Sequence, residues 1–514
     1  MTPGQVARMK FVTDLHLHSK YSRAVSQDMV LPKMAEWAKM KGIDVLACGD
    51  FTHPFWFDQL KNELCEAGKG LYKLKSTVNS SQLTGRNHQL LTENREPVHF
   101  LLSCEISSIY SQGGKTRRIH NLFFFQSLES VSKFNSSLIK RGANLRSDGR
   151  PIMGISAKDL AKIALNVDSK ALIIPAHAWT PWFSVFGSFS GFDSVEECFG
   201  DMAPYIYGIE TGLSSDPAMN WQIADLDGRA ILSFSDAHSL EKMGREATVF
   251  EAEEISYDSI YWAIWNARGP VTSFPPASAR SRPKSNRNQK DNVELRAVGN
   301  PSTGATPRTK LSNHPTIQPS NYPSKIAFTI EFYPEEGKYH FTGHRDCGVS
   351  QSPEETLQNG DICPVCGKQL TVGVIHRVEE LKTRNPKYEI RDMNGVRWVY
   401  PAGDRRPPFV SLVPLSEIIA EAFESAAKTK KVFDQYRLLV DNLGSEFGVL
   451  LKVDIGEIAK FAQPKVVDGI EKVRSGDIKI EPGYDGKFGV VKIWDEDVQK
   501  QKENTNDAQL NLFV

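Results

Sequence analysis

Residues 11–18 read FVTDLHLH, an apolar run that passes directly into three candidate metal ligands. Successive side chains of a strand point to opposite faces, so Asp14, His16 and His18 fall on one side and the two leucines on the other. The alternation predicts a strand that buries its leucines and presents two imidazoles and a carboxylate together at its end.

Further apolar runs in the first half of the chain repeat this arrangement. They end at or carry His53, Glu105, His120, His177, Glu210, Asp236 and His238. Helix-like stretches, such as residues 30–41 and 157–164, lie between several of these runs. The alternation predicts an α/β fold with a parallel barrel, and such barrels collect function at the C-terminal ends of their strands.

Histidines gather at these strand ends, which carry six of the twelve in the chain, and acidic residues accompany them. A single such histidine is more often a hydrogen-bonded structural residue than a ligand, but a random distribution of histidines would not place six of them at strand ends. Imidazole and carboxylate in mixture suit zinc, manganese or iron better than magnesium or calcium, which prefer oxygen ligands. The sequence therefore predicts an enzyme with a multi-metal site.

The composition is that of a globular protein. The chain has 514 residues, 40% of them hydrophobic, and its 62 basic residues balance 62 acidic ones. This balance argues against binding of nucleic acid by bulk charge, although it leaves room for local patches. The first residues lack the apolar core of a signal peptide, and no run approaches the roughly 18 apolar residues that span a bilayer. We expect a cytoplasmic protein that does not bind membranes.

Three of the seven cysteines form a second candidate metal site. Residues 344–347 read HRDC and residues 363–366 read CPVC, two pairs with the spacing of a structural zinc module. The predicted ligands are His344, Cys347, Cys363 and Cys366. His340 or His376 is the alternative fourth ligand, and a pair of unligated thiols in a turn is the alternative to a zinc site.

Changes in composition divide the chain. Residues 276–325 are rich in Pro, Ser, Asn and Thr and carry nine Lys or Arg against Asp291 and Glu294, so they cannot bury a core. This basic segment is either a plain disordered linker or a tether that also touches a polyanion. Residues 416–423 and 432–443 have helical apolar spacing. The predicted parts are a barrel at 1–275, the linker at 276–325, a zinc-binding module at 326–395, a mainly helical domain at 396–496 and a disordered tail at 497–514.

The first half resembles, motif by motif, the polymerase and histidinol phosphatase (PHP) superfamily of metal-dependent phosphoesterases. The matching motifs are, in order, DLHLHS at 14–19, the motif that contains His53, the single residues Glu105 and His177, and SDAH at 235–238. The resemblance implies a distorted seven-stranded barrel that holds up to three metal ions. Two departures bear on the third ion: Phe51 and Thr52 are inserted before His53, and residues 20–23 read KYSR where many relatives supply a further ligand.

The second half sharpens the resemblance to one family. Its motifs are EEGKYH at 335–340, CPVCGK at 363–368, HRVEEL at 376–381 and IEPGYDG at 480–486. Together with the barrel motifs they look like endonuclease Q, over residues 11–275 and 326–495. That family nicks DNA on the 5′ side of a deaminated base (hypoxanthine, uracil or xanthine) or of an abasic site. The resemblance implies the same activity here.

Such hydrolysis needs divalent metals that activate a water and contact the phosphate oxygens. With this chemistry we assign as metal ligands His16, His18, His53, Glu105, His120, His177, Asp236 and His238, with Asp14 and Asp50 as further ligands or as residues that orient the imidazoles. The expected catalytic residues are Asp236, His238 and Glu105. We expect two or three ions of zinc, manganese or iron, with magnesium as an alternative activator, and one structural zinc.

Two segments are candidates for contacts with DNA. Arg117 and Arg118 are expected to bind the substrate phosphate, with a solvated basic turn as the alternative. Residues 179–189 read WTPWFSVFGSF and begin two residues after His177. Selection of a deaminated base requires taking it out of the stack, and this aromatic loop is either a stacking surface for DNA or an apolar lid packed on the core. The candidate stacking residues are Trp179, Trp182 and Phe183.

The chain closes on QLNLFV at 509–514, an apolar cluster that follows a polar stretch. It resembles the peptide by which bacterial replication and repair proteins bind the sliding clamp. The resemblance implies a clamp partner and a bacterial source. The anchors are Gln509, Leu510, Leu512 and Phe513.

Two other functions compete with DNA repair. One is a small-molecule phosphatase of the same superfamily, and the other is a non-catalytic, clamp-bound scaffold with a degenerate barrel. The zinc module and the clamp peptide disfavour the phosphatase, and the nearly complete ligand set disfavours the scaffold.

Overall fold

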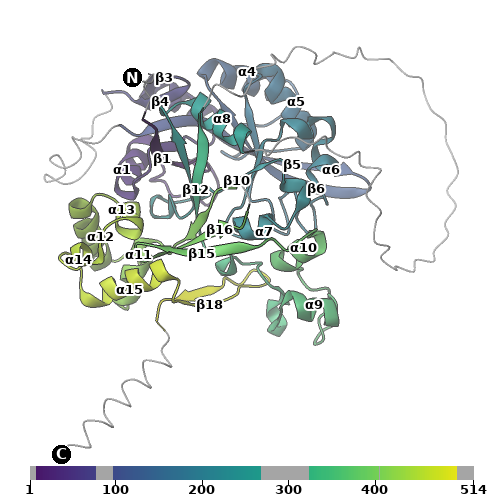
Figure 1. Ribbon diagram of the computed structural model, residues 1–514. Coiled ribbons are helices and arrows are strands. Elements are labelled where there is room, and N and C mark those ends of the chain that lie inside the picture. The colour runs from purple at the N-terminus through teal and green to yellow at the C-terminus, as the bar shows by residue number, and fades with distance from the viewer. Residues whose placement is uncertain (1–6, 77–96, 268–322, 404–405, 495–514) are drawn as a thin grey trace, which may run out of the picture.

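The computed structural model describes residues 7–76, 97–267, 323–403 and 406–494. Its framework is one mixed sheet of 13 strands with helices around it (Figure 1). Ten of the strands run in the order β15 (Tyr388–Met393), β16 (Val396–Pro401), β17 (Phe409–Ser411), β12 (Lys325–Glu331), β11 (Ala247–Ala252), β1 (Met9–Asp14), β2 (Val45–Ala47), β5 (His99–Gln112), β4 (Leu71–Leu74) and β3 (Leu64–Gly68). The others are β6 (Lys115–Phe125), β7 (Ile152–Met153) and β8 (Leu172–Pro175).

The sheet is parallel only in part. β1 pairs parallel to β2, and β2 pairs parallel to β5, but β5 pairs antiparallel to β6, and β6 pairs antiparallel to β8. The direction reverses because Gly113 and Gly114, both with positive φ, close a hairpin between β5 and β6. The structure thus confirms a mixed α/β fold with a large central sheet, corrects the expectation of purely parallel neighbours, and leaves a closed seven-stranded barrel as a prediction.

Helices of the first half cover this sheet. They are α1 (Leu31–Lys41), α2 (Pro54–Glu63), α4 (Leu128–Ile139), α5 (Ala157–Val167), α6 (Val195–Phe199), α7 (Pro217–Asn220) and α8 (Tyr257–Asn266). α1 and α5 confirm the helices predicted from apolar spacing. Ser156 caps α5 by accepting a hydrogen bond from the Asp159 backbone N–H, and Gly42 ends α1 in the left-handed conformation. The short strands β9 (Gly208–Glu210) and β10 (Ala230–Leu232) form a separate parallel pair.

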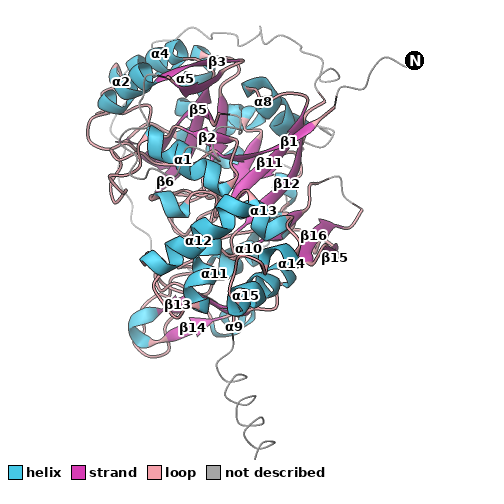
Figure 2. Ribbon diagram, turned by 90° about the vertical axis from the view of Figure 1, so that its left-hand side faces the viewer, coloured by secondary structure: helices cyan, strands magenta, loops and turns pink. Residues whose placement is uncertain are grey.

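The second half continues the same sheet and then turns helical. β12 pairs antiparallel with β11 and parallel with β17. The remaining elements are β13 (Thr342–His344), β14 (Val349–Gln351), α9 (Pro353–Asn359), α10 (Val374–Leu381), α11 (Leu415–Ala422), α12 (Lys430–Leu443), α13 (Glu446–Leu451), α14 (Ile455–Ile458), α15 (Pro464–Ser475), β18 (Lys479–Glu481) and β19 (Val490–Lys492). Figure 2 shows α11 to α15 gathered together below β1, β11 and β12. This C-terminal helical region agrees with the predicted one.

A buried polar contact joins the C-terminal helices to the first half. Lys41 at the end of α1 lies 2.7 Å from a carboxylate oxygen of Glu446 in α13, and both side chains are buried. The Tyr436 hydroxyl of α12 donates a second hydrogen bond to Glu446. Removing one partner of a buried ion pair lowers the free energy of unfolding by on the order of 3–5 kcal/mol. The contact therefore stabilises the packing of the C-terminal helices against α1.

Some predictions fall on residues outside the described ranges. The basic linker at 276–325 lies outside them up to residue 322, and the tail at 497–514 lies outside them entirely, together with Gln509, Leu510, Leu512 and Phe513. The domain boundaries therefore stay predictions. Among the helices that the structure describes, none is both long and apolar enough to cross a membrane.

Candidate metal centre

The end of β1 carries two predicted ligands into the interior. His16 and His18 follow Asp14, the last residue of β1, and both imidazoles are buried. Their rings lie 5.3 Å apart in an edge-to-face arrangement, because alternate residues of an extended chain share a face. Leu15 and Leu17 pack into the hydrophobic core, as the alternation predicted.

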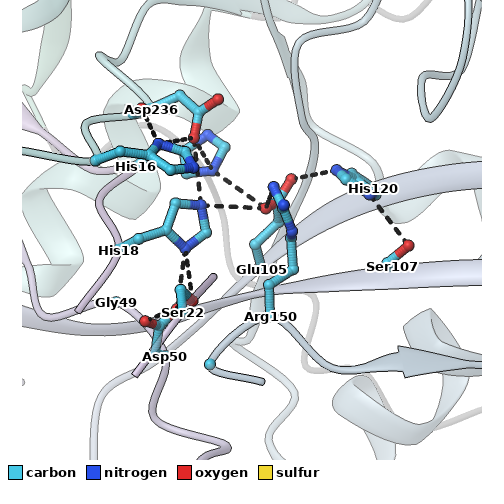
Figure 3. A network of polar contacts seen from close by, with 12 residues as sticks. His16, His18, Ser22, Gly49, Asp50, Glu105, Ser107, His120, Arg150 and Asp236 are labelled. Carbon is cyan, nitrogen blue, oxygen red and sulfur yellow. Dashed lines mark hydrogen bonds and ion pairs between the residues drawn. The ribbon is translucent and has the colours of Figure 1, made fainter. Parts of the chain in front are cut away.

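Asp236 completes the first group of ligand atoms (Figure 3). Its Oδ1 lies 3.5 Å from His16 Nε2 and 3.2 Å from His18 Nε2. All three atoms are buried, and none has a hydrogen-bond partner within the described part of the chain. A buried polar atom without a partner costs on the order of 1–3 kcal/mol. Three such atoms converging on one point fit a divalent cation, which would satisfy all of them.

A second group forms where β5, β6 and His177, the second residue after β8, meet. Glu105 Oε1 lies 2.7 Å from His120 Nδ1 and 3.1 Å from His177 Nε2, and the two nitrogens are 3.2 Å apart. The register of the hairpin brings the first two together, because His120 stands opposite Ser107, two residues from Glu105. Two imidazole nitrogens and a carboxylate at this spacing are again a cation site.

Glu105 joins the two groups. Its other oxygen, Oε2, lies 3.3 Å from His18 Nε2 and 3.7 Å from His16 Nε2. Burial alone raises the pKa of Glu105, but the positive charges of His120, Arg150 and His16 hold that pKa well below its usual range. An ionised carboxylate therefore faces both groups at once, which is the arrangement of a bridging ligand in a two-metal site.

Two carboxylates orient the first pair of imidazoles. Asp50 Oδ1 lies 3.0 Å from His18 Nδ1, and Glu210 Oε1 lies 2.9 Å from His16 Nδ1. Each contact holds Nδ1 and turns Nε2 toward the centre. Burial lowers the pKa of both imidazoles, yet the surrounding carboxylates raise it well above its usual range. The pocket therefore favours positive charge, as a bound cation would supply.

Asp14 does not contact the ligand atoms. Its oxygens accept hydrogen bonds from the backbone N–H and the hydroxyl of Ser235, at 3.0 and 2.6 Å, and from the Gly244 N–H at 2.8 Å. These hydrogen bonds lower the pKa of Asp14, but burial raises it more, and the net result is a pKa of about 6. Asp14 thus holds the loop that carries Asp236, and of the two roles expected for it the geometry supports the orienting one.

Backbone strain gathers at the centre. Asp50, His177 and Asp236 have φ of 48°, 30° and 46°, in the left-handed region that side chains other than glycine rarely adopt. Each costs on the order of 1–3 kcal/mol and persists only where the surroundings enforce it. A side chain at Gly212 would come within 2.5 Å of His177 Cβ, so that glycine is required for the close approach. Strain at three residues that build or orient the centre points to a functional site.

Two predicted histidine ligands, as well as Asp14 and Asp50, lie outside both groups. The His238 ring lies 4.8 Å from that of His18, and its Nδ1 donates to the Asp236 carbonyl at 2.9 Å. Its Nε2 is thereby left for a metal or a substrate. His53 stacks on Tyr21 with ring centroids 4.5 Å apart, and its Nδ1 is buried without a partner among the described residues.

The two predicted phosphate-binding arginines lie over aromatic rings. The Arg117 guanidinium stands 4.0 Å above the Phe192 ring and donates to the Gly191 carbonyl. The Arg118 guanidinium lies 5.7 Å from the Phe183 ring. Neither is among the groups that surround the ligand atoms, so a role in holding the scissile phosphate stays a prediction.

The aromatic loop divides between core and surface. Trp179 is fully buried, stacks on Phe186 and donates its N–H to Asn220 Oδ1 at 2.8 Å, so its faces are not available to a base. Trp182 stacks on the exposed Phe189 at 4.9 Å with an angle of 7° between the rings. Phe183 lies 4.8 Å from the His120 ring and flanks the second group. Trp179 therefore fits the alternative of an apolar lid packed on the core, whereas a role in stacking on DNA stays a prediction for Trp182 and Phe183.

Two site residues were missed from the sequence. Glu210 was noted only as the end of an apolar run, yet it binds His16 and also accepts the His177 backbone N–H at 2.7 Å. Arg150 donates to Glu105 Oε2 at 3.1 Å, and it lies in a loop rather than at the end of a strand (Figure 3). The strand-end signal could have identified Glu210, whereas nothing local to the sequence marks Arg150.

The Cys/His cluster comes together as predicted from its spacing. Ligand atoms of His344, Cys347, Cys363 and Cys366 all lie within 4.8 Å of one another. Turns with positive φ at Gly348 and Gly367 follow the two pairs. Burial raises the pKa of Cys363, but backbone hydrogen bonds from Cys366 and Val365 bring it down to about 6, which favours the metal-binding thiolate. His340 and His376 do not belong to this group.

The chain is similar to several known proteins. Residues 414–477 match the family described as the MJ0043 C-terminal domain. The MJ0043 protein of Methanocaldococcus jannaschii is 27% identical over 332 residues, which cover 64% of this chain and only 33% of that relative. The YqxK protein of Bacillus subtilis is 26% identical over 380 residues, 73% of this chain and 74% of that one.

Solved structures match along nearly the whole chain. The lesion-specific endonuclease PfuEndoQ of Pyrococcus furiosus is 27% identical with a TM-score of 0.69, covering 97% of this chain and 99% of that one. An Endonuclease Q in complex with a 27-mer duplex that has an abasic lesion at the active site matches with the same identity and a TM-score of 0.69, over 95% and 98% of the two chains. Together, the motifs and this near-complete structural match support the assignment of the chain to the endonuclease Q family.

Proposed function

We propose that this protein is a metal-dependent DNA repair endonuclease that hydrolyses the phosphodiester 5′ to a deaminated base (hypoxanthine, uracil or xanthine) or to an abasic site. The observation that carries the proposal is the pair of ligand groups joined by Glu105, in a chain whose structural relatives include a lesion-specific endonuclease. The bound abasic duplex of one relative supports the abasic site as a substrate.

Each ligand group is proposed to hold one divalent ion. His16, His18 and Asp236 would hold the first ion, His120 and His177 would hold the second, and Glu105 contacts both groups of residues. Such ions supply Lewis-acid contact with the phosphate and an activated water. Zinc, manganese and iron suit these donors. A third ion would fall to His53, but the described residues gather no other group of donors around it.

The residues around the ions have separate tasks. Asp50 and Glu210 keep the imidazoles aimed at the centre. Glu105 and Asp236 would provide the negative charge that holds the ions, and His238, partly exposed beside His18, is proposed to pass a proton to the leaving oxygen. We assign Asp236, His238 and Glu105 as the catalytic residues on these contacts.

Lesion selection requires surfaces for a displaced base and its flanking strand. Trp182 with Phe189, and Phe183 beside His120, offer aromatic faces on the loop that follows His177. Arg117 and Arg118 lie on β6, below the same loop, and stay proposed contacts for the phosphate backbone.

Two further elements complete the proposal. One zinc ion held by His344, Cys347, Cys363 and Cys366 stabilises the module between β13 and α10. The peptide at 509–514 is proposed to bind the sliding clamp of a bacterial cell, which keeps the enzyme on DNA in the cytoplasm. This peptide lies outside the described residues, so its support is the sequence alone.

Labelled duplexes that contain inosine, uracil or an abasic site test the proposal directly. Purified protein with manganese or magnesium should nick them 5′ to the lesion, and Asp236→Ala and His238→Ala should not. Asp201→Ala, which removes a surface carboxylate that pairs with Lys158, is the matched control and should nick like the wild type. Wild-type turnover by either site variant would refute the assignment, and phosphate release from small phosphomonoesters without nicking would favour a phosphatase.

A further inference from the structure

Three segments form a lip beside the first ligand group: residues 19–23, residues 52–55 leading into α2, and residues 144–150. Hydrogen bonds tie them together. The Gly149 N–H donates to the Tyr21 carbonyl at 3.0 Å, and the Thr52 hydroxyl donates to the Gly149 carbonyl at 3.2 Å. The lip is therefore one surface, although its parts are far apart in the sequence.

The lip is held at a fixed distance from the ligands. A Cβ on Gly149 would lie 2.3 Å from Ser22 Oγ and 2.4 Å from Asp50 Oδ2, so the loop approaches Asp50 as closely as a backbone can. Asp50 in turn holds His18 (Figure 3). Whatever binds the lip is thus positioned relative to the metal centre.

Aromatic rings line this surface. Tyr21 stacks on His53 at 4.5 Å and lies 6.4 Å from Phe55, whose side chain is 55% exposed. A large exposed ring on a rigid support, next to a catalytic centre, is costly to hydrate and is suited to stacking. His53 adds a buried Nδ1 that has no partner among the described residues and is available to a ligand.

Cations accompany the rings. The lip carries four basic residues, Lys20, Arg23, Arg146 and Arg150, against the single carboxylate of Asp148. Lys20 Nζ lies 5.3 Å from the Tyr21 ring, and the Arg146 guanidinium lies 5.6 Å from the Phe55 ring. Arg23 pairs with Asp148 at 3.4 Å. Basic groups interleaved with aromatic faces are how proteins track a nucleic-acid strand.

Arg150 links the lip to the reacting groups. Its Nη1 donates to Glu105 Oε2 at 3.1 Å, and the guanidinium has further N–H groups in the same plane. A planar fork of this kind binds two oxygens of a phosphate. Its contact with the bridging carboxylate places it beside both ligand groups.

We propose that the lip binds the DNA strand adjoining the scissile phosphate, with a base stacked on Phe55 and Tyr21, backbone phosphates on Lys20 and Arg146, and the scissile phosphate on Arg150. The inference deepens the proposed endonuclease function and rests on it.

Binding and nicking of a short abasic duplex by the full chain test the lip. Phe55→Ala should weaken binding by about 5- to 150-fold, the range seen when one stacking aromatic is removed. Arg146→Ala should weaken it on every sequence and reduce the slope of log affinity against log salt by about 1. Phe433→Ala is the matched control, since Phe433 of α12 is an exposed ring outside the lip, and it should bind like the wild type.

Arg150→Lys separates phosphate binding from metal binding. It should lower kcat while the metal content, measured by elemental analysis, stays at the wild-type value. Wild-type binding by both Phe55→Ala and Arg146→Ala would overturn the proposal, and so would wild-type kcat in Arg150→Lys. Binding is measured separately from nicking. A wild-type protein that binds the duplex but does not nick it would refute the proposed function, and the binding of the Phe55→Ala and Arg146→Ala variants would still test whether the lip contacts DNA.

Discussion

The two candidate metal sites differ in how their ligands are assembled and in what surrounds them. At the metal centre the ligands come from strands far apart in the sequence, are buried, and share one carboxylate, Glu105. In the Cys/His cluster, four ligands come from two short pairs, and Cys366 is exposed. Four protein ligands close a tetrahedral zinc site, whereas the second group of the metal centre has only His120 and His177 beside the shared Glu105, which would leave positions open for water and substrate. The contrast fits the proposal that the metal centre is catalytic and the Cys/His cluster structural.

Loss of the shared ligand should have the largest effect. Glu105→Ala removes a carboxylate from both ligand groups, so nicking of an abasic duplex should fall by well over the roughly 100-fold that loss of an orienting partner costs. Metal content should fall as well, while far-UV circular dichroism stays at the wild-type signal. If the variant kept both its metals and its rate, the bridge between the two groups would be wrong.

A smaller effect is expected when an orienting carboxylate is neutralised. Glu210→Gln keeps the shape of the side chain but weakens its hold on His16 Nδ1, so activity or metal affinity should fall by roughly 10- to 100-fold. Metal titration together with single-turnover nicking measures both quantities. Glu197→Gln, a surface change on α6, serves as control. Equal behaviour of the two variants would remove Glu210 from the site.

The Cys/His cluster should respond in metal content and local order rather than in chemistry. Cys363→Ser should release one zinc per chain and increase hydrogen exchange around residues 340–380, because a structural zinc supplies folding free energy to a small module. The ions of the metal centre should stay bound. Unchanged zinc in this variant would show that the cluster does not hold the metal.

The tail should have the smallest effect on catalysis. Deleting residues 509–514 should abolish capture by an immobilised bacterial sliding clamp and leave the nicking of a short oligonucleotide unchanged, since the ligands all lie elsewhere. A truncated protein that still bound the clamp as well as the full chain would exclude the peptide as the contact. A loss of nicking would mean that the tail belongs to the fold.

The sequence identified the candidate ligands at strand ends better than the residues that contact them. His16, His18 and Asp236, which the structure brings together, were identified because each follows an apolar run. Arg150 was not, since it reaches Glu105 from a loop 45 residues away and no local pattern marks such a contact. Trp179 is a residue whose role the sequence left open. An aromatic residue next to a candidate ligand can lie in the core or at the surface, and the packing of Trp179 against Phe186 shows that it lies in the core.

Topology was predicted less well than the grouping of the candidate ligands. A strand and its neighbour have the same apolar pattern whether they pair parallel or antiparallel, so the β5–β6 hairpin was not distinguished from a parallel unit. Gly113 and Gly114 are the local signal that could have revealed it. The C-terminal helices α11 and α12 were predicted because their apolar residues recur with helical spacing.

Metal content and nicking, measured on the same preparation, test most directly the proposal that the metal centre nicks lesion-containing DNA. Chelation of the full-length protein should abolish the nicking of an abasic duplex, and return of manganese or zinc should restore it in the wild type but not in Glu105→Ala. Nicking at the wild-type rate by protein shown to contain no metal would contradict the account.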